Sequence, residues 1–409
     1  MMVIRKSAAI AALAAGSILV LAGCSSGSSS DETTAPVDGG ELTVWVDSDR
    51  AEALQDVVAT FEEETGSTVN LVIKDNSKIR DDFTQAVPAG NGPDITIGAH
   101  DWLGSLVQDG LVAPLELGDK VSEFEDVAIQ AFTYDGQVYG LPYATENVAL
   151  MRNVDLAAEA PADFDEMIQM GNDAGTQYAF VVGLDPANAD PYHLYPFQTS
   201  FGNSVFEQNA DGSYTSTLTI ADAAGQDFAT WLGEQGAAGT INLNLTQDLS
   251  KEAFNAGESP FIITGPWNVA DSQAAGINIA VDPIPSAGGD TARPFVGVQG
   301  FYLSAKSENT ILANEFMVNY LGTEDVQYAL YEAGNRPPAL TAAYEAASSD
   351  PIIEGFGAVG AEGAPMPSIP EMGNVWEFWG VAEANIINGQ DPESTWTKMA
   401  DDIQASIDG

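Results

Sequence analysis

The chain has 409 residues, and its 60 Asp and Glu against 13 Lys and Arg give a formal net charge of −47. This acid excess excludes nucleic acid as a partner, because binding phosphate groups requires a basic surface, and it disfavours direct contact with anionic lipid headgroups. Hydrophobic residues make up 45% of the chain and include 7 Trp, 12 Tyr and 17 Phe, which predicts a folded protein of two domains or one large domain.

The N-terminal residues are typical of an export signal. Two basic residues precede an uncharged, mostly apolar stretch over 7–22, which is short for a membrane span and suits a secretory signal. The stretch ends at Cys24, the only cysteine of the chain, and resembles the signal of bacterial lipoproteins, which implies that Cys24 becomes the lipid-bearing N-terminus. We therefore predict a signal peptide over 1–23, a flexible polar tether over 24–40 and a lipid anchor at the extracellular face of the plasma membrane. The alternative is an ordinary signal peptide with an incidental cysteine.

The segment that follows alternates between strand and helix patterns. In chain order we predict a strand over 41–47, a helix over 50–64 ended by Gly66, a strand over 68–73, a helix over 77–87, a strand over 94–97 and a helix over 102–108 ended by Gly110. This order is typical of a parallel α/β sheet, in which ligands bind at the carboxyl ends of the strands. Polar residues follow two of these ends, at 47–49 and at 100–101.

The rest of the chain has longer helical stretches and fewer clear strands. We predict strands over 261–264 and 277–281, and helices over 221–233, 251–255 and 307–321. In the last of these helices the apolar residues expected to face mostly inward are Ile311, Leu312, Phe316, Val318 and Leu321. From about Asp350 the chain is predicted to be helical apart from a stretch rich in Gly and Pro.

The motifs of common enzyme classes are absent from the sequence or lack the right context. Residues 355–360 match the GxGxxG pattern of dinucleotide sites, but Gly363, Pro365 and Pro367 follow closely and favour a loop instead of the required strand–turn–helix. There is no phosphate-binding GxxxxGK motif and no GxSxG nucleophile motif, and the two histidines lack metal-ligand spacing. We therefore predict no cofactor and no metal. A glycosidase with two catalytic carboxylates stays open, because acidic residues are abundant.

Aromatic residues next to Gly, Pro and polar residues are the most distinctive feature of the body of the chain. Trp267 follows a predicted strand, Tyr192 and Tyr195 lie in a run with two prolines, and Trp376 lies in an aromatic cluster. Flat rings suit the C–H faces of sugar rings, while carboxylates accept hydrogen bonds from hydroxyl groups. The alternative for each aromatic residue is a place in the hydrophobic core.

Six short runs form an ordered set that is more specific than any of them alone. They are 91–95 (NGPDI), 99–101 (AHD), 110–115 (GLVAPL), 265–267 (GPW), 294–298 (PFVGV) and 366–372 (MPSIPEM), the last leading to Trp376. In this order the runs resemble the maltose- and maltodextrin-binding proteins of bacterial ABC importers. The resemblance extends from about Gly40 to the C-terminus.

The resemblance implies an α/β protein with the two-lobe fold of periplasmic binding proteins, with a hinge and a ligand cleft between the lobes. Lobe one is expected over 41–144 and 299–346, and lobe two over 148–295 and 350–409. It also implies a monomeric binding protein, not an enzyme, that captures a neutral maltodextrin-type oligosaccharide and delivers it to the permease subunits of an ABC importer.

Individual site residues are carried over from the same resemblance. The implied hydroxyl-binding residues are Asp49, Arg50, Asp101 and Glu146, with Glu146 at the floor of the cleft. The implied aromatic platforms are Tyr192, Trp267 and Trp376, with Tyr195 at a position that is usually aromatic.

Two departures from the family pattern lie close together. Gly98 stands where the maltodextrin binders have a stacking tryptophan, and Trp102 follows Asp101 where they have arginine. We therefore expect Trp102 to replace the missing aromatic and to reshape one end of the cleft.

Three alternatives to a maltodextrin-binding protein stay open. They are a binding protein for another oligosaccharide, a binding protein for a non-sugar solute such as a peptide or a polyamine, which the acidity would suit, and a secreted glycosidase.

Overall fold

The computed structural model describes residues 39–209 and 214–409. The predicted signal peptide, Cys24 and most of the predicted tether lie outside the described residues. Within the described part, no helix is both long enough and apolar enough to cross a bilayer.

The first of two large sheets has six strands. They are β1 (Glu41–Val46), β2 (Thr68–Ile73), β3 (Ile95–Ala99), β6 (Gly140–Glu146), β13 (Phe295–Leu303) and β14 (Ala364–Pro365), in the order β14-β13-β3-β1-β2 with β6 also paired to β13. Strand β1 pairs in parallel with β2 and with β3, as the alternation of strands and helices predicts. Strand β13 runs antiparallel to β3 and to β6, so the sheet as a whole is mixed.

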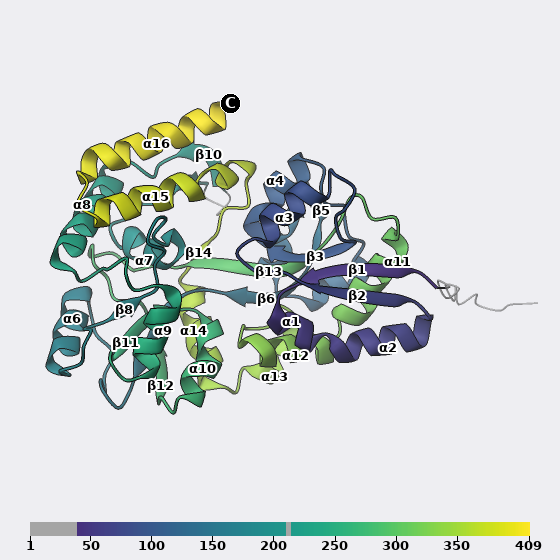
Figure 1. The fold of residues 1–409 in the computed structure, drawn as a ribbon, viewed down its shortest axis with the longest axis horizontal. Coiled ribbons are helices and arrows are strands. Elements are labelled where there is room, and N and C mark those ends of the chain that lie inside the picture. The colour runs from purple at the N-terminus through teal and green to yellow at the C-terminus, as the bar shows by residue number, and fades with distance from the viewer. Residues whose placement is uncertain (1–38, 210–213) are drawn as a thin grey trace, which may run out of the picture. The chain divides into compact units, whose positions relative to one another are not determined.

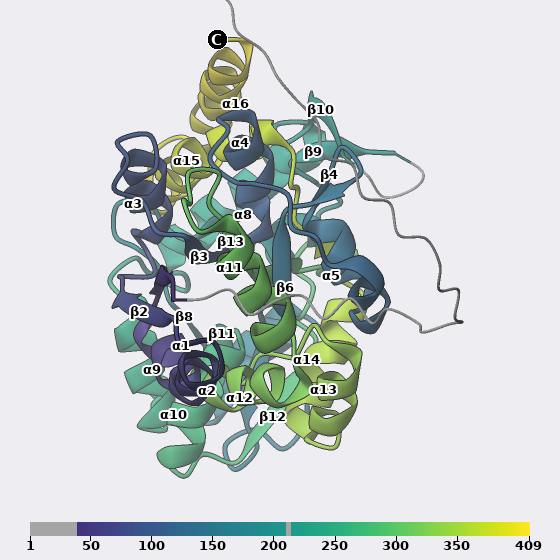
Figure 2. The same cartoon turned by 90° about the vertical axis from the view of Figure 1, so that its right-hand side faces the viewer.

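Helices pack on this sheet and extend its core. They are α1 (Ser48–Ala53), α2 (Gln55–Thr65), α3 (Ile79–Ala86), α4 (Leu103–Gln108), α5 (Asp126–Ala131), α11 (Thr310–Glu315), α12 (Glu324–Gly334) and α13 (Thr341–Ala347). The predicted helix over 50–64 is two helices, which meet at the fully buried Leu54. Gly66 ends α2 in the left-handed conformation that glycine adopts without strain (φ 71°), as predicted. Helices α1 and α12 lie side by side (Figures 1 and 2).

The predicted helix over 307–321 is interrupted, and one of the residues predicted to face inward, Ile311, faces solvent. It begins as α11 and continues as a π-helical turn, Phe316–Leu321. Leu312 and Phe316 are buried, whereas Ile311 is 75% exposed. Adjacent residues on a helix point about 100° apart, so burial of Leu312 turns Ile311 towards solvent.

The second large sheet has four strands and its own helices. Its strands are β7 (Ala149–Asn153), β8 (Val181–Val182), β11 (Phe261–Thr264) and β12 (Ile279–Asp282), in the order β12-β7-β11-β8. The associated helices are α6 (Phe164–Asp173), α7 (Pro191–Ser200), α8 (Ala223–Ala238), α9 (Gln247–Asn255), α10 (Val269–Ala274), α14 (Pro351–Ala361), α15 (Trp376–Ile387) and α16 (Pro392–Asp408). Helices α8, α15 and α16 pack on one another.

Short elements complete the described chain. They are the antiparallel pairs β4 (Thr133–Tyr134) with β5 (Gln137–Val138) and β9 (Phe206–Gln208) with β10 (Tyr214–Leu218), and the 3-10 turns His100–Trp102, Gly118–Glu123, Pro266–Asn268 and Pro370–Asn374.

The GxGxxG run lies inside helix α14, so the loop predicted for it is wrong. The helix extends to Ala361, and the Gly and Pro residues that follow end it only there. A side chain at Gly355 would come within 2.7 Å of Val281 on β12, and one at Gly360 within 2.8 Å of Asn147. The glycines therefore allow the helix to pack closely against its neighbours, and they do not form a phosphate-binding turn.

Buried hydrophobic residues fall into two main regions of the chain. One core draws on 42–144 and 298–343, and two further clusters draw on 148–295 and 352–403. A small fourth cluster joins Tyr331 and Ala347 to Ile353. Strands β6 and β13 of the first sheet run side by side near the centre of the view in Figure 1. The lobe boundaries given above stay a prediction, which this separation of cores supports.

Candidate binding site

A cavity of about 670 Å³ is lined by residues from both groups of elements. From the first sheet it receives residues that follow β1, β2 and β3 and the last residue of β6, and from the other side residues at the start of α7, after β11 and at the start of α15. The volume lies within the range of roughly 300–1,000 Å³ that is usual for small-ligand sites. Seven of the nine predicted ligand-binding residues line it: Asp49, Arg50, Asp101, Glu146, Tyr192, Trp267 and Trp376.

The end of β1 holds a buried cation. Asp47 caps helix α1, accepting a hydrogen bond from the Arg50 backbone at 3.0 Å, and it forms an ion pair with the Arg50 guanidinium. Arg50 Nε donates to the Tyr143 hydroxyl at 2.7 Å. Burial disfavours the charge, but Tyr143, Asp47 and Glu146 together raise the pKa of Arg50. Arg50 is therefore a permanently charged donor fixed at the wall of the cavity.

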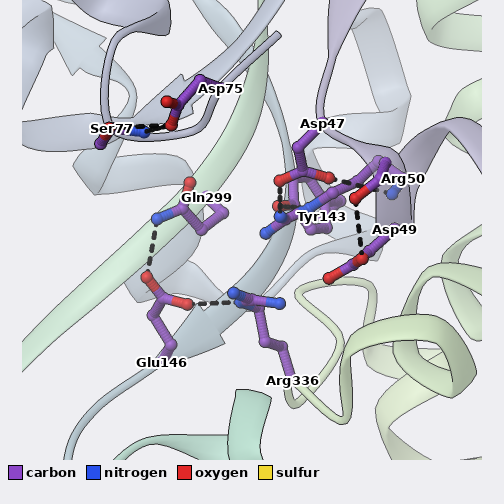
Figure 3. Close-up of polar contacts among 10 residues, drawn as sticks. Asp47, Asp49, Arg50, Asp75, Ser77, Tyr143, Glu146, Gln299 and Arg336 are labelled. Atoms are coloured by element: carbon purple, nitrogen blue, oxygen red, sulfur yellow. Dashed lines mark hydrogen bonds and ion pairs between the residues drawn. The ribbon is translucent and has the colours of Figure 1, made fainter. Parts of the chain in front are cut away.

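Glu146, at the end of β6, has both carboxylate oxygens engaged. Gln299 Nε2 donates to Oε1 at 2.7 Å, and Arg336 Nε donates to Oε2 at 2.6 Å (Figure 3). Burial alone would raise the pKa of Glu146, but Arg336, the bond from Gln299 and the nearby Arg50 bring that pKa below its usual value. Glu146 is thus an ionised acceptor in a buried position.

Asp101 and Trp376 join the two sides of the cavity directly. The indole N–H of Trp376, on α15, donates to Asp101 Oδ2 at 3.1 Å. Burial raises the pKa of Asp101, against the influence of His100, Arg80 and this hydrogen bond. Asp101 Oδ1 makes no hydrogen bond with another side chain among the described residues.

His100, beside Asp101, ties three segments together. Its Nδ1 accepts a hydrogen bond from the Val298 backbone at 2.9 Å, so the proton is on Nε2, which donates to the Met366 carbonyl at 3.0 Å. Burial lowers the pKa of His100, which keeps the ring neutral. The ring therefore links β3 to β13 and to the segment that leads into α15.

Aromatic rings form the opposite wall. The Tyr192 ring lies 6.5 Å from the Trp267 ring, centroid to centroid, and the His193 ring meets Trp267 edge-on at 5.9 Å. Asp190 caps α7, and its Oδ2 lies 2.8 Å from His193 Nδ1. Burial opposes ionisation of Asp190, but His193 and its hydrogen bonds lower the pKa of Asp190 overall. The wall thus combines ring faces with a charged acceptor.

Two predicted site residues do not line the cavity. Tyr195 is 1% exposed, because its ring stacks on Phe295 with centroids 3.6 Å apart and meets Trp379 edge-on. Trp102 lies over Gly98, where an added Cβ would come within 2.4 Å of its ring. Trp102 therefore fills the space over Gly98, as the departure from the family pattern indicated, but it packs against the first core instead of facing the cavity.

Sequence reasoning missed several residues that line the cavity. They are Lys74, Asp75, Asn76, Ala99, Asp190, His193, Gln247, Gln299, Arg336 and Met366, whereas Asp47 and Ser48 belong to the polar run expected at the end of the first strand. Asp190 had a local signal, since an aspartate directly before a proline is typical of a helix start. Arg336 had a weaker signal, since it is one of only 13 basic residues and lies in a Gly-Asn-Arg-Pro-Pro run. Gln299 is brought in only by pairing of β13 with β6, which no local pattern reveals.

The arrangement suits a ligand rich in hydroxyl groups. Carboxylates and guanidinium groups on one wall supply acceptors and donors, and flat rings on the other supply apolar faces. In the described residues, no group of three or more His, Cys, Asp or Glu is placed to hold a metal ion.

Fold and site together define a protein that binds a solute between two α/β bodies. The chain belongs to the bacterial extracellular solute-binding proteins, whose family model matches residues 56–355. It is 29% identical to the galactooligosaccharide-binding protein of Bacillus subtilis, over 99% of this chain and 98% of that protein. It is 30% identical to a maltodextrin-binding protein of the same organism, over 92% of this chain and 91% of that protein.

A solved structure has the same fold. The maltotriose-binding protein of Thermus thermophilus, bound with maltotriose, superposes with a TM-score of 0.81 at 29% identity, covering 90% of this chain and 100% of that one. A maltooligosaccharide ABC transporter solute-binding lipoprotein of Streptococcus pneumoniae is 27% identical over 91% of this chain. The two-lobe fold of periplasmic binding proteins and the resemblance to maltodextrin binders are thereby confirmed.

Proposed function

We propose that this protein captures a neutral oligosaccharide of the maltodextrin type outside the cell and delivers it to the permease subunits of an ABC importer. The observation that carries the proposal is one cavity in which Asp101 and Glu146 face Tyr192, Trp267 and Trp376. The relatives named above, which bind maltodextrin, maltotriose or galactooligosaccharide, support the same class of ligand.

Capture is proposed to occur by closure of two lobes, 41–144 with 299–346 and 148–295 with 350–409. Hydroxyl groups pair with Asp49, Asp101 and Glu146 in charge-assisted hydrogen bonds of roughly 1.5–3 kcal/mol each. The aromatic rings cover the sugar faces from the other side. Because each side supplies part of the site, the ligand favours the closed arrangement only through contacts made in that arrangement, and the permease reads that arrangement.

A lipid on Cys24 is proposed to hold the protein at the outer face of the membrane. The sequence around Cys24 and the lipoprotein relative from Streptococcus pneumoniae support this anchor. The net charge of −47 supports a monomer that stays clear of anionic headgroups apart from its lipid.

In this proposal the protein binds the sugar without changing it chemically, and membership of a solute-binding family supports this. One observation favours a glycosidase as the second candidate. The pKa of Asp101 is raised while that of Glu146 is lowered, and opposite displacement of two carboxyl groups is the pattern of a catalytic acid and base. Release of glucose from maltotriose therefore has to be measured beside binding.

A thermal-shift screen of maltodextrins, galactooligosaccharides, polyamines and peptides tests the proposal. A ligand that binds only the folded protein stabilises it by about 2.7 kcal/mol at 100 times its Kd. We expect a rise in Tm with maltotriose and longer maltodextrins and no glucose release. A rise with a polyamine or a peptide alone, or turnover of the sugar, would contradict the proposal.

A further inference from the structure

We propose that Arg336 and Gln299 are positioning residues that hold the Glu146 carboxylate in one orientation as an acceptor for a sugar hydroxyl. This inference rests on the proposed function, because it assigns roles within the same cavity. Neither residue was expected from the sequence, and both line the cavity.

The geometry around Glu146 leaves room for one further partner at each oxygen. Oε1 and Oε2 each accept a single side-chain hydrogen bond, from Gln299 at 2.7 Å and from Arg336 at 2.6 Å. A carboxylate oxygen has two lone pairs, so each keeps one acceptor site. Figure 3 shows the two bonds reaching the carboxylate from different sides. Together they hold the plane of the carboxylate, so the free acceptor sites have fixed directions.

The chain around Arg336 is built to place its guanidinium. Helix α12 ends at Asn335 in the left-handed conformation (φ 52°), which turns the chain towards β6. The Thr145 backbone N–H then donates to the Pro337 carbonyl at 2.9 Å, which sets residue 336 beside the end of β6. Gly334 leaves space for this side chain, because an added Cβ would lie 2.6 Å from Arg336 Nη1 and would push the guanidinium aside. A turn, a glycine and a strand-like pairing thus converge on one side chain.

Arg336 also contacts the aromatic wall. Its guanidinium carbon lies 5.6 Å from the centre of the Trp267 ring, within the range of a cation–π interaction. One side chain therefore links the carboxylate on β6 to a ring that follows β11. A change at Arg336 should alter the fluorescence of Trp267 as well as the state of Glu146.

Without Arg336 the charge of Glu146 would be poorly compensated. The other titratable groups that influence or face Glu146 are Arg50, His100, Tyr143 and Tyr192. Of these only Arg50 is a cation, and it is already paired with Asp47. Since burial raises the pKa of a carboxyl group, loss of Arg336 moves the pKa of Glu146 upward, and its carboxylate becomes easier to protonate as the pH falls.

The test is the affinity for maltotriose between pH 5 and pH 8, measured by calorimetry on wild-type protein and variants. For Arg336→Met we expect an affinity at least tenfold weaker at pH 5 than at pH 8, because a protonated Glu146 no longer accepts the same bonds. The wild type should vary less than threefold. Arg336→Lys, which keeps the charge, should restore most of the flat profile.

Two further variants separate positioning from a general structural effect. Glu146→Gln has no carboxylate to titrate, so the double variant with Arg336→Met should bind weakly with a flat profile. Arg293→Met is the matched control, because Arg293 donates to the carbonyls of Glu362 and Gly363 and does not line the cavity; its affinity and profile should equal those of the wild type.

The outcomes distinguish this inference from the proposed function. A wild type that binds no sugar refutes both. Normal wild-type binding with a flat profile and unchanged affinity in Arg336→Met refutes only the positioning role. If Arg336→Met melts too low for titration, Gln299→Leu takes its place, with an expected several-fold loss that grows as the pH falls; an unchanged affinity there overturns the inference.

Discussion

Replacing Trp376 by alanine tests whether the ring on α15 binds the ligand. The side chain is half-buried, its ring stacks on Trp379 with centroids 5.6 Å apart, and its N–H donates to Asp101 at 3.1 Å. Truncation of a tryptophan at the centre of a binding site typically removes 2 kcal/mol or more, which is about 30-fold in Kd. We therefore expect Trp376→Ala to weaken maltotriose binding by at least tenfold in calorimetry.

Two more tryptophan variants refine this prediction. Trp376→Phe keeps a ring but loses the bond to Asp101, so its affinity should lie between those of the wild type and the alanine variant. Trp102→Ala changes a ring that does not line the cavity, and its affinity should stay within twofold of the wild type. An unchanged affinity in Trp376→Ala, or a larger loss in Trp102→Ala, would refute the reasoning.

Three further predictions concern stability. Glu383 is fully buried, neither carboxyl oxygen has a hydrogen bond of good geometry within the described residues, and burial raises its pKa well above 4.5 even though the Trp379 indole opposes the shift. The contribution of the protonated Glu383 to stability is therefore present below about pH 4.5 and is lost as the pH rises. In urea unfolding, Glu383→Gln should raise the free energy of unfolding by about 1–3 kcal/mol over the wild type at pH 7.5 and by less at pH 4.5. An equal gain at both pH values would be contrary evidence. Burial lowers the pKa of His100 below its usual value of 6.5. The stability contributed by its neutral ring is therefore present above pH 6.5 and is lost as the pH falls. His100→Gln should lose about 1–3 kcal/mol at pH 7.5 and less at pH 5.5, and a loss independent of pH would speak against the neutral bridge. Gly355→Val should lower the unfolding free energy by about 1–3 kcal/mol, because its side chain would clash with Val281, and an unaffected Tm would exclude the packing role of this glycine.

Local patterns predicted the strands best. The strand over 68–73 and the strand over 261–264 are confirmed residue for residue, because each is a short run of β-favouring residues between clear boundaries. Helix boundaries were less accurate. Leu54 sits where two helices meet, and nothing in its sequence neighbourhood marks the change of direction.

Contacts with residues far away along the chain explain the predictions that were wrong. The GxGxxG run is helical because its glycines allow close packing on β12, and that contact lies some 75 residues away along the chain. Tyr195 lies in the core because Phe295, on a distant strand, offers it a stacking partner. Local sequence carries no record of either partner.

The candidate site divides in the same way. The residues at strand ends and in aromatic runs were within reach of sequence reasoning, and resemblance to a family supplied Glu146 and Trp376. The hydrogen bonds that keep Glu146 ionised were beyond the reach of sequence reasoning, because Gln299 and Arg336 reach Glu146 only through strand pairing and a turn after α12.

The central claim is that an intact, neutral oligosaccharide lies between the carboxylates and the aromatic rings of this one cavity. The most direct measurement is a crystal structure of the protein grown with maltotriose. The account predicts density for an uncleaved trisaccharide, with hydroxyl groups on Asp101 and Glu146 and a ring face on Trp376. Sugar bound elsewhere on the surface, or density for cleaved glucose units in the cavity, would contradict it.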